Sequence, residues 1–482
     1  MNCNILLAAV GLCSITTAFG QDKEKQNFVL FIADDCSHID LGCYGSIDSK
    51  TPNIDRFASE SIQFMQGYQA APMSSPTRHN LYTGVWPVKS GTYPNHTLIT
   101  NPETETIVQH MRRLGYDVSL YGKSHVAPKE KFDFDSGYDN ADYKLVLDQV
   151  DVYLDEKKEA NDNFCMILGS HEPHSPWTLG DRSLFDPDKI SLPEMYVDTK
   201  LTRENFVNYL AEVNYMDAQF GALLKLLENK GLDDNTIVVF LSEQGNSFPF
   251  AKWTLYDMGV KSAYLVRMPN GIQAGTKRNA IVEYVDIVPT FIDLAGGTPS
   301  KEIDGKSIKD VLLGKTDTHK KYTFSIQTTR TINSGAPYYG IRSVSDGEYR
   351  YIINLTPEMT FENASTRGGK GSGVFKEWKE LGKTNEFARE TSYRYQHRPS
   401  RELYNVKIDP YCMHNIIDDK DQKAKIKELD EALRTWMKEC GDRGQATEMD
   451  ATSHIYPNRA EKYLNNEKKR NASINKQGKK KN

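Results

Sequence analysis

The sequence predicts an α/β protein with a large, mainly parallel central sheet flanked by helices. A smaller C-terminal α+β subdomain with an antiparallel sheet follows it. Apolar runs rich in β-branched residues alternate along the chain with amphipathic helical segments, which is the pattern of parallel strands joined by helices. The 482 residues exceed what one small core accommodates, so we expect one large domain and a smaller companion.

Four of the apolar runs end directly in polar side chains that can take part in chemistry. These runs and the residues after them are 28–32 before Ala33-Asp34-Asp35, 118–121 before Gly122-Lys123-Ser124-His125, 164–168 before Gly169-Ser170-His171-Glu172-Pro173-His174, and 237–241 before Ser242-Glu243-Gln244-Gly245. A capped loop explains any one such cluster. Ligands of an open α/β sheet, however, bind beyond the carboxyl ends of its strands. Four clusters at the same strand end therefore predict one shared site.

The chain divides into four predicted parts. They are a signal peptide at 1–20, the catalytic domain at 21–337, the C-terminal subdomain at 338–445 and a basic polar tail at 446–482. The first part is an apolar run that ends in the small-x-small sequence Ala18-Phe19-Gly20, which is typical of signal cleavage. Strands around the turn Asp346-Gly347 indicate a hairpin in the subdomain.

The overall composition argues against several classes of partner. The net charge of −5 gives no global basic field for nucleic acid. The N-terminal apolar run is short for a membrane span, and no later stretch has the length and apolarity of one. We therefore expect an exported protein that neither binds nucleic acid nor spans a membrane. The periplasm is the expected location, with the cell surface or the medium as alternatives.

The acidic clusters predict a metal site. Asp34, Asp35 and the pair Glu243-Gln244 offer only oxygen ligands, which select Ca²⁺ or Mg²⁺ over Zn²⁺. Adjacent carboxylates repel one another unless a cation lies between them. We predict Ca²⁺, with Mg²⁺ as the second choice.

The basic residues predict a site for a polyanionic group. Arg78, Lys123 and Lys252 carry positive charge that does not titrate away near neutral pH. Together with a cation they describe a site for phosphate or sulfate. His125 and His174 can protonate a leaving oxygen or position the anion.

The nucleophile is expected in the loop that precedes a helix at residues 77–81. Ser74 or Ser75 stands just before this helix, and helix N-termini favour anions and developing negative charge. A plain serine at this place would serve a phosphatase. The residues around it indicate a different enzyme.

The sequence Ser74-Ser-Pro-Thr-Arg78-His-Asn-Leu-Tyr-Thr83-Gly84 resembles the signature of type I sulfatases, (Cys or Ser)-x-Pro-(Ser)-Arg-x-x-x-x-Thr-Gly. The match places the residue that this family oxidises to formylglycine at Ser74 rather than Ser75. It departs from the signature only in Thr77, where serine is usual. The serine form is typical of anaerobic bacteria. It implies an oxygen-independent sulfatase-maturating enzyme as a partner.

The resemblance implies an alkaline-phosphatase-like sandwich fold and an aldehyde hydrate as the nucleophile. One hydroxyl of the hydrate attacks sulfur, and the second expels sulfate as the aldehyde re-forms. The catalytic residues that it implies are Ser74, Arg78, Lys123, His125, His174 and Lys252. The metal ligands that it implies are Asp34, Asp35, Ser74, Glu243 and Gln244.

The resemblance extends from about Asn27 to about Trp436 and includes one departure at the metal site. The pair Glu243-Gln244 stands where the family usually has Asp followed by Asn or His. Each replacement keeps an oxygen ligand but is one methylene longer. We expect the metal to bind there with a shifted geometry.

Two short stretches, 122–128 and 245–249, are similar to the N-sulfoglucosamine sulfohydrolase (sulfamidase) branch of the family. Lys252 differs, because that branch tends to carry arginine there. We expect the substrate to be a sulfated oligosaccharide of the heparan type, with an N-sulfated or O-sulfated amino sugar. His96 and His171 are candidate sugar contacts, and structural hydrogen bonds are an equally good interpretation of each.

Three alternatives stay open at this point. The first is an O-sulfatase that acts on galactose, N-acetylgalactosamine or N-acetylglucosamine of mucin or chondroitin type. The second is a phosphoesterase of the alkaline-phosphatase superfamily that uses Ser74 directly. The third is a non-catalytic protein that binds sulfated glycans, to which only the change at Glu243-Gln244 points.

Overall fold

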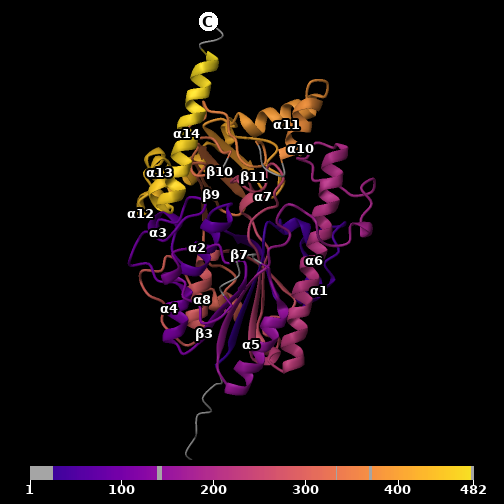
Figure 1. Cartoon of the computed structure of the whole chain (residues 1–482), viewed down its shortest axis with the longest axis vertical. Helices are drawn as coiled ribbons and strands as arrows, with labels where there is room; N and C mark the ends of the chain where they lie inside the picture. The colour runs from indigo at the N-terminus through magenta and orange to yellow at the C-terminus, as the bar shows by residue number, and fades with distance from the viewer. Residues whose placement is uncertain (1–24, 138–143, 333, 368–371, 479–482) are drawn as a thin grey trace, which may run out of the picture.

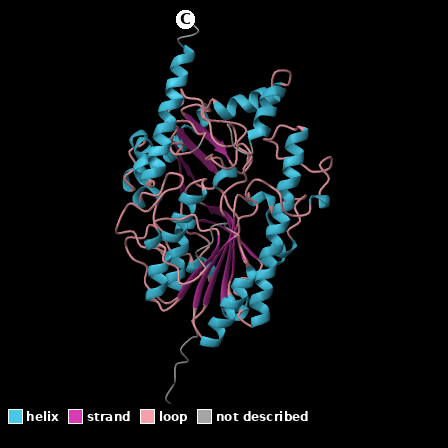
Figure 2. Cartoon of the chain, in the orientation of Figure 1, coloured by secondary structure: helices cyan, strands magenta, loops and turns pink. Residues whose placement is uncertain are grey.

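The computed structural model describes residues 25–137, 144–332, 334–367 and 372–478. Two β-sheets organise the chain, and Figure 2 shows the larger sheet fanning out below the smaller one, with helices on both sides. The predicted signal peptide lies outside the described residues. Within the described ranges, no helix combines the length and the apolar character needed to cross a membrane.

The larger sheet has seven strands in the order β3-β4-β1-β5-β6-β2-β7. Their bounds are β1 Asn27–Ala33, β2 Ile62–Tyr68, β3 Asp117–Gly122, β4 Phe164–Gly169, β5 Thr236–Ser242, β6 Tyr264–Arg267 and β7 Thr276–Glu283. β3, β4, β1 and β5 run parallel, as do β2 and β7, whereas β6 is antiparallel to both of its neighbours. The predicted large, mainly parallel sheet is confirmed.

The central strand β1 shows how the sheet makes two cores. Its seven residues are all buried, because β4 and β5 pair with its edges and helices cover both faces. Val29 and Phe31 point to one core, and Phe28 and Leu30 to the other. Phe31 packs on Phe220 and Phe240 in the first core, with ring centroids 5.0 and 5.8 Å apart.

Helices flank the sheet on both sides (Figure 1). The first core is covered by α1, α5 and α6, and the second by α2, α4 and α8. The bounds of these helices are α1 Pro52–Ser59, α2 Ser74–Thr83, α4 Ile107–Arg113, α5 Leu147–Ala160, α6 Lys200–Lys230 and α8 Ile287–Leu294. The remaining helices of the large region are α3 Pro87–Ser90, α7 Asp257–Val260 and α9 Lys309–Leu312.

The smaller sheet is antiparallel, as predicted, with the order β11-β10-β9-β8. Its strands are β8 Thr323–Gln327, β9 Ile341–Ser345, β10 Tyr349–Asn354 and β11 Arg401–Asn405, and its helices are α10 Ser372–Leu381, α11 Glu386–Gln396 and α12 Lys423–Glu439. α12 packs on the sheet through Leu429, Leu433 and Trp436. β9 and β10 form the hairpin predicted around Asp346-Gly347.

The structure differs from the predicted boundaries at two places. The smaller sheet begins with β8, before the boundary placed at residue 338. The chain after residue 445 folds into α13 (Gln445–Asp450) and α14 (Pro457–Gly478) instead of leaving the subdomain as a tail. Glu448 of α13 is fully buried and accepts hydrogen bonds from Thr328 and from the backbone of β8's loop. Local composition gives no sign of this long-range contact.

The ends of β3 and β4 approach so closely that Gly122 has no room for a side chain. Its φ is +81°, and a Cβ there would lie 2.2 Å from the Gly169 carbonyl oxygen. Gly231, at the C-terminus of α6, has a φ of +64° but nothing within 4 Å of its Cβ position. An alanine at Gly231 would therefore meet only the strain of a positive φ, whereas an alanine at Gly122 would meet the same strain and a steric clash.

We predict that Gly122→Ala destabilises the protein more than Gly231→Ala. The positive φ costs about 1–2 kcal/mol at either position. The clash adds about 1–3 kcal/mol at Gly122 only. Urea unfolding measures both free energies, and equal losses in the two variants would contradict the close approach of β3 and β4.

Candidate active site

The four polar clusters lie together beyond the carboxyl ends of adjacent parallel strands. Asp34 and Asp35 follow β1, Lys123 follows β3, His171 and His174 follow β4, and Glu243 and Gln244 follow β5. Backbone hydrogen bonds join these ends: the Asp34 N–H donates to the Glu172 carbonyl at 3.1 Å, and the Glu243 N–H to the Ala33 carbonyl at 2.7 Å. The strand order alone thus brings the clusters into one site.

α2 carries the predicted nucleophile into this site. All ten residues of α2 are buried although most are polar, and Leu81 and Tyr82 belong to the second core. Ser74 is its first residue, so the free N–H groups of the first turn lie beside the hydroxyl. Arg78, one turn later, points the same way as Ser74.

The Ser74 hydroxyl is the hub of the cluster. Its Oγ donates to Glu243 Oε2 at 2.6 Å and lies 3.3 Å from Asp34 Oδ1. It accepts from Lys123 Nζ at 3.2 Å and from Gln244 Nε2 at 3.1 Å. Every predicted metal ligand except Asp35 therefore contacts Ser74 directly.

Three buried ion pairs surround this hub. Lys123 pairs with Asp34, Arg78 with Glu243, and Lys252 with Asp35, the last at 2.6 Å. The three acids are fully buried and the three bases nearly so. When all six groups are ionised, their formal charges cancel.

Arg78 makes contacts that a lysine could not reproduce. Its Nε donates to Glu243, and its Nη1 donates to the Lys123 carbonyl at 2.7 Å. Its Nη2 is buried and has no hydrogen-bond partner among the described residues. A Cβ at Gly169 would lie 2.3 Å from the Lys123 carbonyl oxygen and 2.9 Å from Nη1, so glycine at the end of β4 allows both groups to lie close to it. Nη2 is a cationic donor left over for a bound anion.

Burial and neighbouring charges raise the pKa of one buried acid, and neighbouring charges lower the pKa values of the other two. Burial and the adjacent Glu243 raise the pKa of Asp34 well above its ordinary value. Burial also opposes ionisation of Asp35, but Lys252 and His174 outweigh it and lower that pKa to about 2. Arg78 and Lys123 overcome the same burial cost at Glu243 and lower its pKa. Asp34 is the acid that a further cation would stabilise most.

The donor set fits a divalent cation with hard oxygen ligands. Oxygens of Asp34, Asp35 and Glu243 all lie within 4.8 Å of one another. Gln244 Oε1 is buried and makes no hydrogen bond among the described residues, so it is an unused oxygen donor at the same place. The longer side chains of Glu243 and Gln244 still reach Ser74, so they remain usable as ligands.

The predicted histidines line the site in two pairs. His174 Nε2 lies 3.6 Å from Asp35 Oδ2, and the ring centroids of His171 and His174 are 5.0 Å apart. His125 Nε2 lies 3.0 Å from His96 Nδ1. Burial lowers the pKa of all four imidazoles, that of His174 to about 3 and that of His96 to about 4. They are therefore neutral until an anion approaches.

Sequence reasoning missed Ser247 as a member of the cluster. Its hydroxyl donates to Asp35 Oδ2 at 2.7 Å, so it shares this carboxylate with Lys252 and Gln244. Ser247 stands only three residues after Gln244, in the stretch 245–249 that resembles the sulfamidase branch. That proximity was the available signal.

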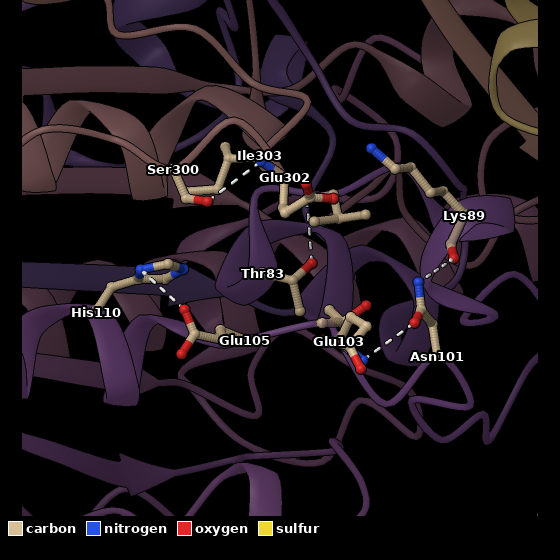
Figure 3. A pocket seen from close by; sticks show the side chains of 11 residues that line it. Thr83, Lys89, Asn101, Glu103, Glu105, His110, Ser300, Glu302 and Ile303 are labelled. Atoms are coloured by element: carbon tan, nitrogen blue, oxygen red, sulfur yellow. Dashed lines mark hydrogen bonds and ion pairs between the residues drawn. The ribbon is translucent and has the colours of Figure 1, made fainter.

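A separate cavity, shown in Figure 3, is lined by Thr83 at the C-terminal end of α2. It has a volume of about 50 Å³, and Thr83, Glu103, Glu105, His110 and Glu302 are among its lining residues. Figure 3 shows His110 turned towards Glu105, and their side chains are 3.8 Å apart. None of the predicted site residues lines this cavity, and its carboxylates make it unsuitable for a sulfate or phosphate.

The fold and the cluster together define an α/β protein whose buried site, at the ends of parallel strands, combines carboxylates with cationic side chains. Two known protein families match the chain. The Sulfatase family matches residues 26–297, and the family described as N-sulphoglucosamine sulphohydrolase, C-terminal, matches residues 245–358. The chain belongs to the sulfatase family, whose members are sulfuric ester hydrolases.

Relatives of known activity cover most of the chain. An ulvan-active sulfatase of Formosa agariphila is 30% identical over 87% of this chain and 81% of its own length. The human N-sulphoglucosamine sulphohydrolase is 22% identical over 91% of this chain and 94% of its own length. A protein solved in complex with its substrate, D-glucosamine-2-N,6-O-disulfate, shares the fold with a TM-score of 0.64. It is 20% identical, and the match covers 87% of this chain and 99% of that one.

We predict that Arg78→Lys lowers kcat/KM for sulfate release by about a hundredfold, because a single ammonium group cannot replace the guanidinium fork in a buried anion site. Initial rates of sulfate release measure the loss. Arg113→Lys is the matched control, since Arg113 is exposed and contacts Glu105 and His110, neither of which belongs to the cluster. If the Arg78→Lys enzyme is as active as the control, Arg78 does not bind the sulfate group.

Proposed function

We propose that this chain is an exported sulfatase that removes sulfate from sulfated glycans through a formylglycine made from Ser74. The observation that carries the proposal is the position of the Ser74 hydroxyl. It lies at the start of α2 and within 3.3 Å of Asp34, Glu243, Gln244 and Lys123. These four contacts place the hydroxyl among the predicted metal ligands and beside a cationic side chain.

The surroundings of Ser74 suit an oxidised side chain better than a plain serine. The hydrated aldehyde supplies two geminal hydroxyls, one to attack sulfur and one whose deprotonation releases sulfate, whereas serine has only one. Glu243 lies 2.6 Å from Oγ and can accept a proton there. Lys123, at 3.2 Å, can hold an oxyanion at the same atom.

We propose Ca²⁺ as the resident cation, with Mg²⁺ as the alternative. Asp34, Asp35, Glu243, the Gln244 amide oxygen and residue 74 would hold it. The ion would neutralise negative charge on the sulfate and on the nucleophile. The raised pKa of Asp34 and the unused oxygen of Gln244 support this assignment.

The remaining residues bind the sulfate group and handle protons. Lys252 and Lys123 supply positive charge, and Arg78 Nη2 supplies a free N–H donor. His125 and His174 are neutral donors or acceptors until the negative charge of the bound sulfate group raises their pKa values. Either imidazole can then protonate the sugar oxygen or nitrogen that leaves.

We propose a heparan-like amino sugar, carrying an N-sulfate or an O-sulfate, as the substrate. The match to the N-sulphoglucosamine sulphohydrolase C-terminal family supports it, as does the likeness to a structure that holds a glucosamine disulfate. Export to the periplasm suits such a role in the degradation of glycosaminoglycan fragments. An O-sulfatase for galactose, N-acetylgalactosamine or N-acetylglucosamine is the second candidate, because relatives named N-acetylglucosamine-6-O-sulfatase and N-acetylgalactosamine-6-sulfatase are 24% and 26% identical to this chain.

We predict that enzyme co-expressed with an anaerobic-type sulfatase-maturating enzyme carries a Ser74 lighter by two hydrogen atoms. Tryptic mass spectrometry, with hydrazide trapping of the aldehyde, measures the conversion. Ser75 is the internal control and should stay unmodified, since it makes none of the contacts of Ser74. Full sulfatase activity with an intact Ser74 would contradict the formylglycine mechanism.

We expect the matured enzyme to release sulfate from N-sulfated or 6-O-sulfated glucosamine in preference to sulfated galactose or N-acetylgalactosamine. A panel of these sugar sulfates, read by ion chromatography of free sulfate, makes the comparison. Ser74→Ala should abolish release from every member. Release from galactose or N-acetylgalactosamine alone would leave the enzyme class intact and overturn the substrate assignment.

A further inference from the structure

A second cavity adjoins the active site, and the C-terminal helix forms part of its wall. It has a volume of about 360 Å³ and lies between His96, Thr331 and the first turns of α14. Arg459 and Lys462 of α14 line it, and none of the described lining residues carries a carboxylate. This size is at the lower end of small-molecule sites, so the cavity has room for about one sugar unit.

His96 links this cavity to the catalytic cluster. Its Nδ1 lies 3.0 Å from His125 Nε2, and His125 follows Lys123 by two residues. Burial first, and then the charges of Arg459, Lys123 and Lys252, lower the pKa of His96 to about 4. His96 therefore stands between the active-site lysines and Arg459, and both groups of charge act on it.

α14 is fixed in place as a wall of the cavity. Arg330, which is 6% exposed, pairs with Glu467 at 3.0 Å. The Tyr463 hydroxyl donates to the Pro337 carbonyl at 3.4 Å, and the Arg330 guanidinium lies 5.8 Å from the Tyr463 ring. Because Arg330 engages Glu467, this carboxylate does not offset the charges of Arg459 and Lys462.

The opposite wall holds two residues in an unfavourable backbone conformation. Thr331 has a φ of +82° and His96 a φ of +56°. A positive φ is costly for a β-branched residue such as Thr331 and persists only where the surrounding structure enforces it. The Thr331 hydroxyl donates to the Asn95 carbonyl at 3.2 Å, which joins the two strained segments. This hydrogen bond therefore ties together two segments of the cavity wall that are distant in sequence.

We infer that this cavity is a subsite for a second anionic group of the glycan. That group lies on the sugar next to the one that carries the scissile sulfate, and Arg459 and Lys462 bind it. A sulfate ester and a uronate carboxylate share the required chemistry. The inference rests on the proposed function, since it extends the glycan-binding site of a sulfatase. It assigns α14, which follows both matched families in the chain, to substrate selection.

The test uses three disaccharides that differ only in the second sugar. Each has an N-sulfated, 6-O-sulfated glucosamine linked to 2-O-sulfated uronate, to unsulfated uronate or to carboxyl-reduced uronate. The matured wild type is compared with Arg459→Ala, Arg459→Gln and Lys462→Ala. Lys468→Ala is the matched control, because Lys468 is an exposed lysine of the same helix that does not line the cavity.

Each cavity variant should raise KM about tenfold for a disaccharide with a charged second sugar, with kcat nearly unchanged. The carboxyl-reduced disaccharide and the Lys468→Ala enzyme should show no such change. A rise in KM confined to the 2-O-sulfated disaccharide identifies sulfate as the bound group. A rise in KM for both uronate-containing disaccharides identifies the carboxylate as the bound group.

Equal kinetics of wild type and cavity variants on all three disaccharides would overturn the subsite. An equal rise in KM for the carboxyl-reduced disaccharide would also overturn it. If the wild type releases no sulfate from any of them, the proposed amino-sugar substrate fails instead. The subsite is then judged by calorimetric titration of Ser74→Ala protein with the 2-O-sulfated disaccharide. The affinity must fall when Arg459→Ala is added, and an unchanged affinity would overturn the inference.

Discussion

The structure depends on one buried cluster in which three carboxylates face three cationic side chains. Asp34, Asp35 and Glu243 are fully buried, and each is paired with Lys123, Lys252 or Arg78. Removing one partner from such a cluster costs about 3–5 kcal/mol, because an unpaired charge remains in a medium of low polarity. The formal balance also has a chemical use, since a divalent cation and a sulfate dianion can enter together without upsetting it.

The surrounding fold is arranged to hold this cluster in place. Parallel strands β3, β4, β1 and β5 end at the same edge, so side chains that are distant in sequence become neighbours. Asp35 adopts a φ of +57°, an uncommon conformation for a residue other than glycine. α2 is polar yet wholly buried, because Ser74 and Arg78 must reach the carboxylates. Local preferences are overridden here in favour of the site.

Much of this could be predicted from the sequence, because the relevant signals are local. The strands β1, β3, β4 and β5 are continuous apolar runs with polar ends, and the segment from Ser74 to Gly84 is a long, specific signature. Other features depend on contacts between distant residues. β6 has only four residues, and its pairing with β5 and β2 makes it a strand. β8 pairs with a sheet whose other strands come later in the chain. Glu448 is buried where residues 328–330 donate hydrogen bonds to its carboxylate. α14 lacks an apolar signature, and contacts with distant residues hold it, among them the pairing of Arg330 with Glu467 and the hydrogen bond from Tyr463 to Pro337.

The binding of inorganic sulfate with and without Ca²⁺ tests whether the buried cluster takes up a cation and an anion together. If the cluster accepts a cation and a dianion as a balanced pair, each must increase the affinity of the other by the same factor. Calorimetric titration of the purified protein should show sulfate binding at least about tenfold more tightly in Ca²⁺ than in EDTA. The same sulfate affinity in both conditions would contradict the account of a charge-balanced site that takes up its metal and its anion together.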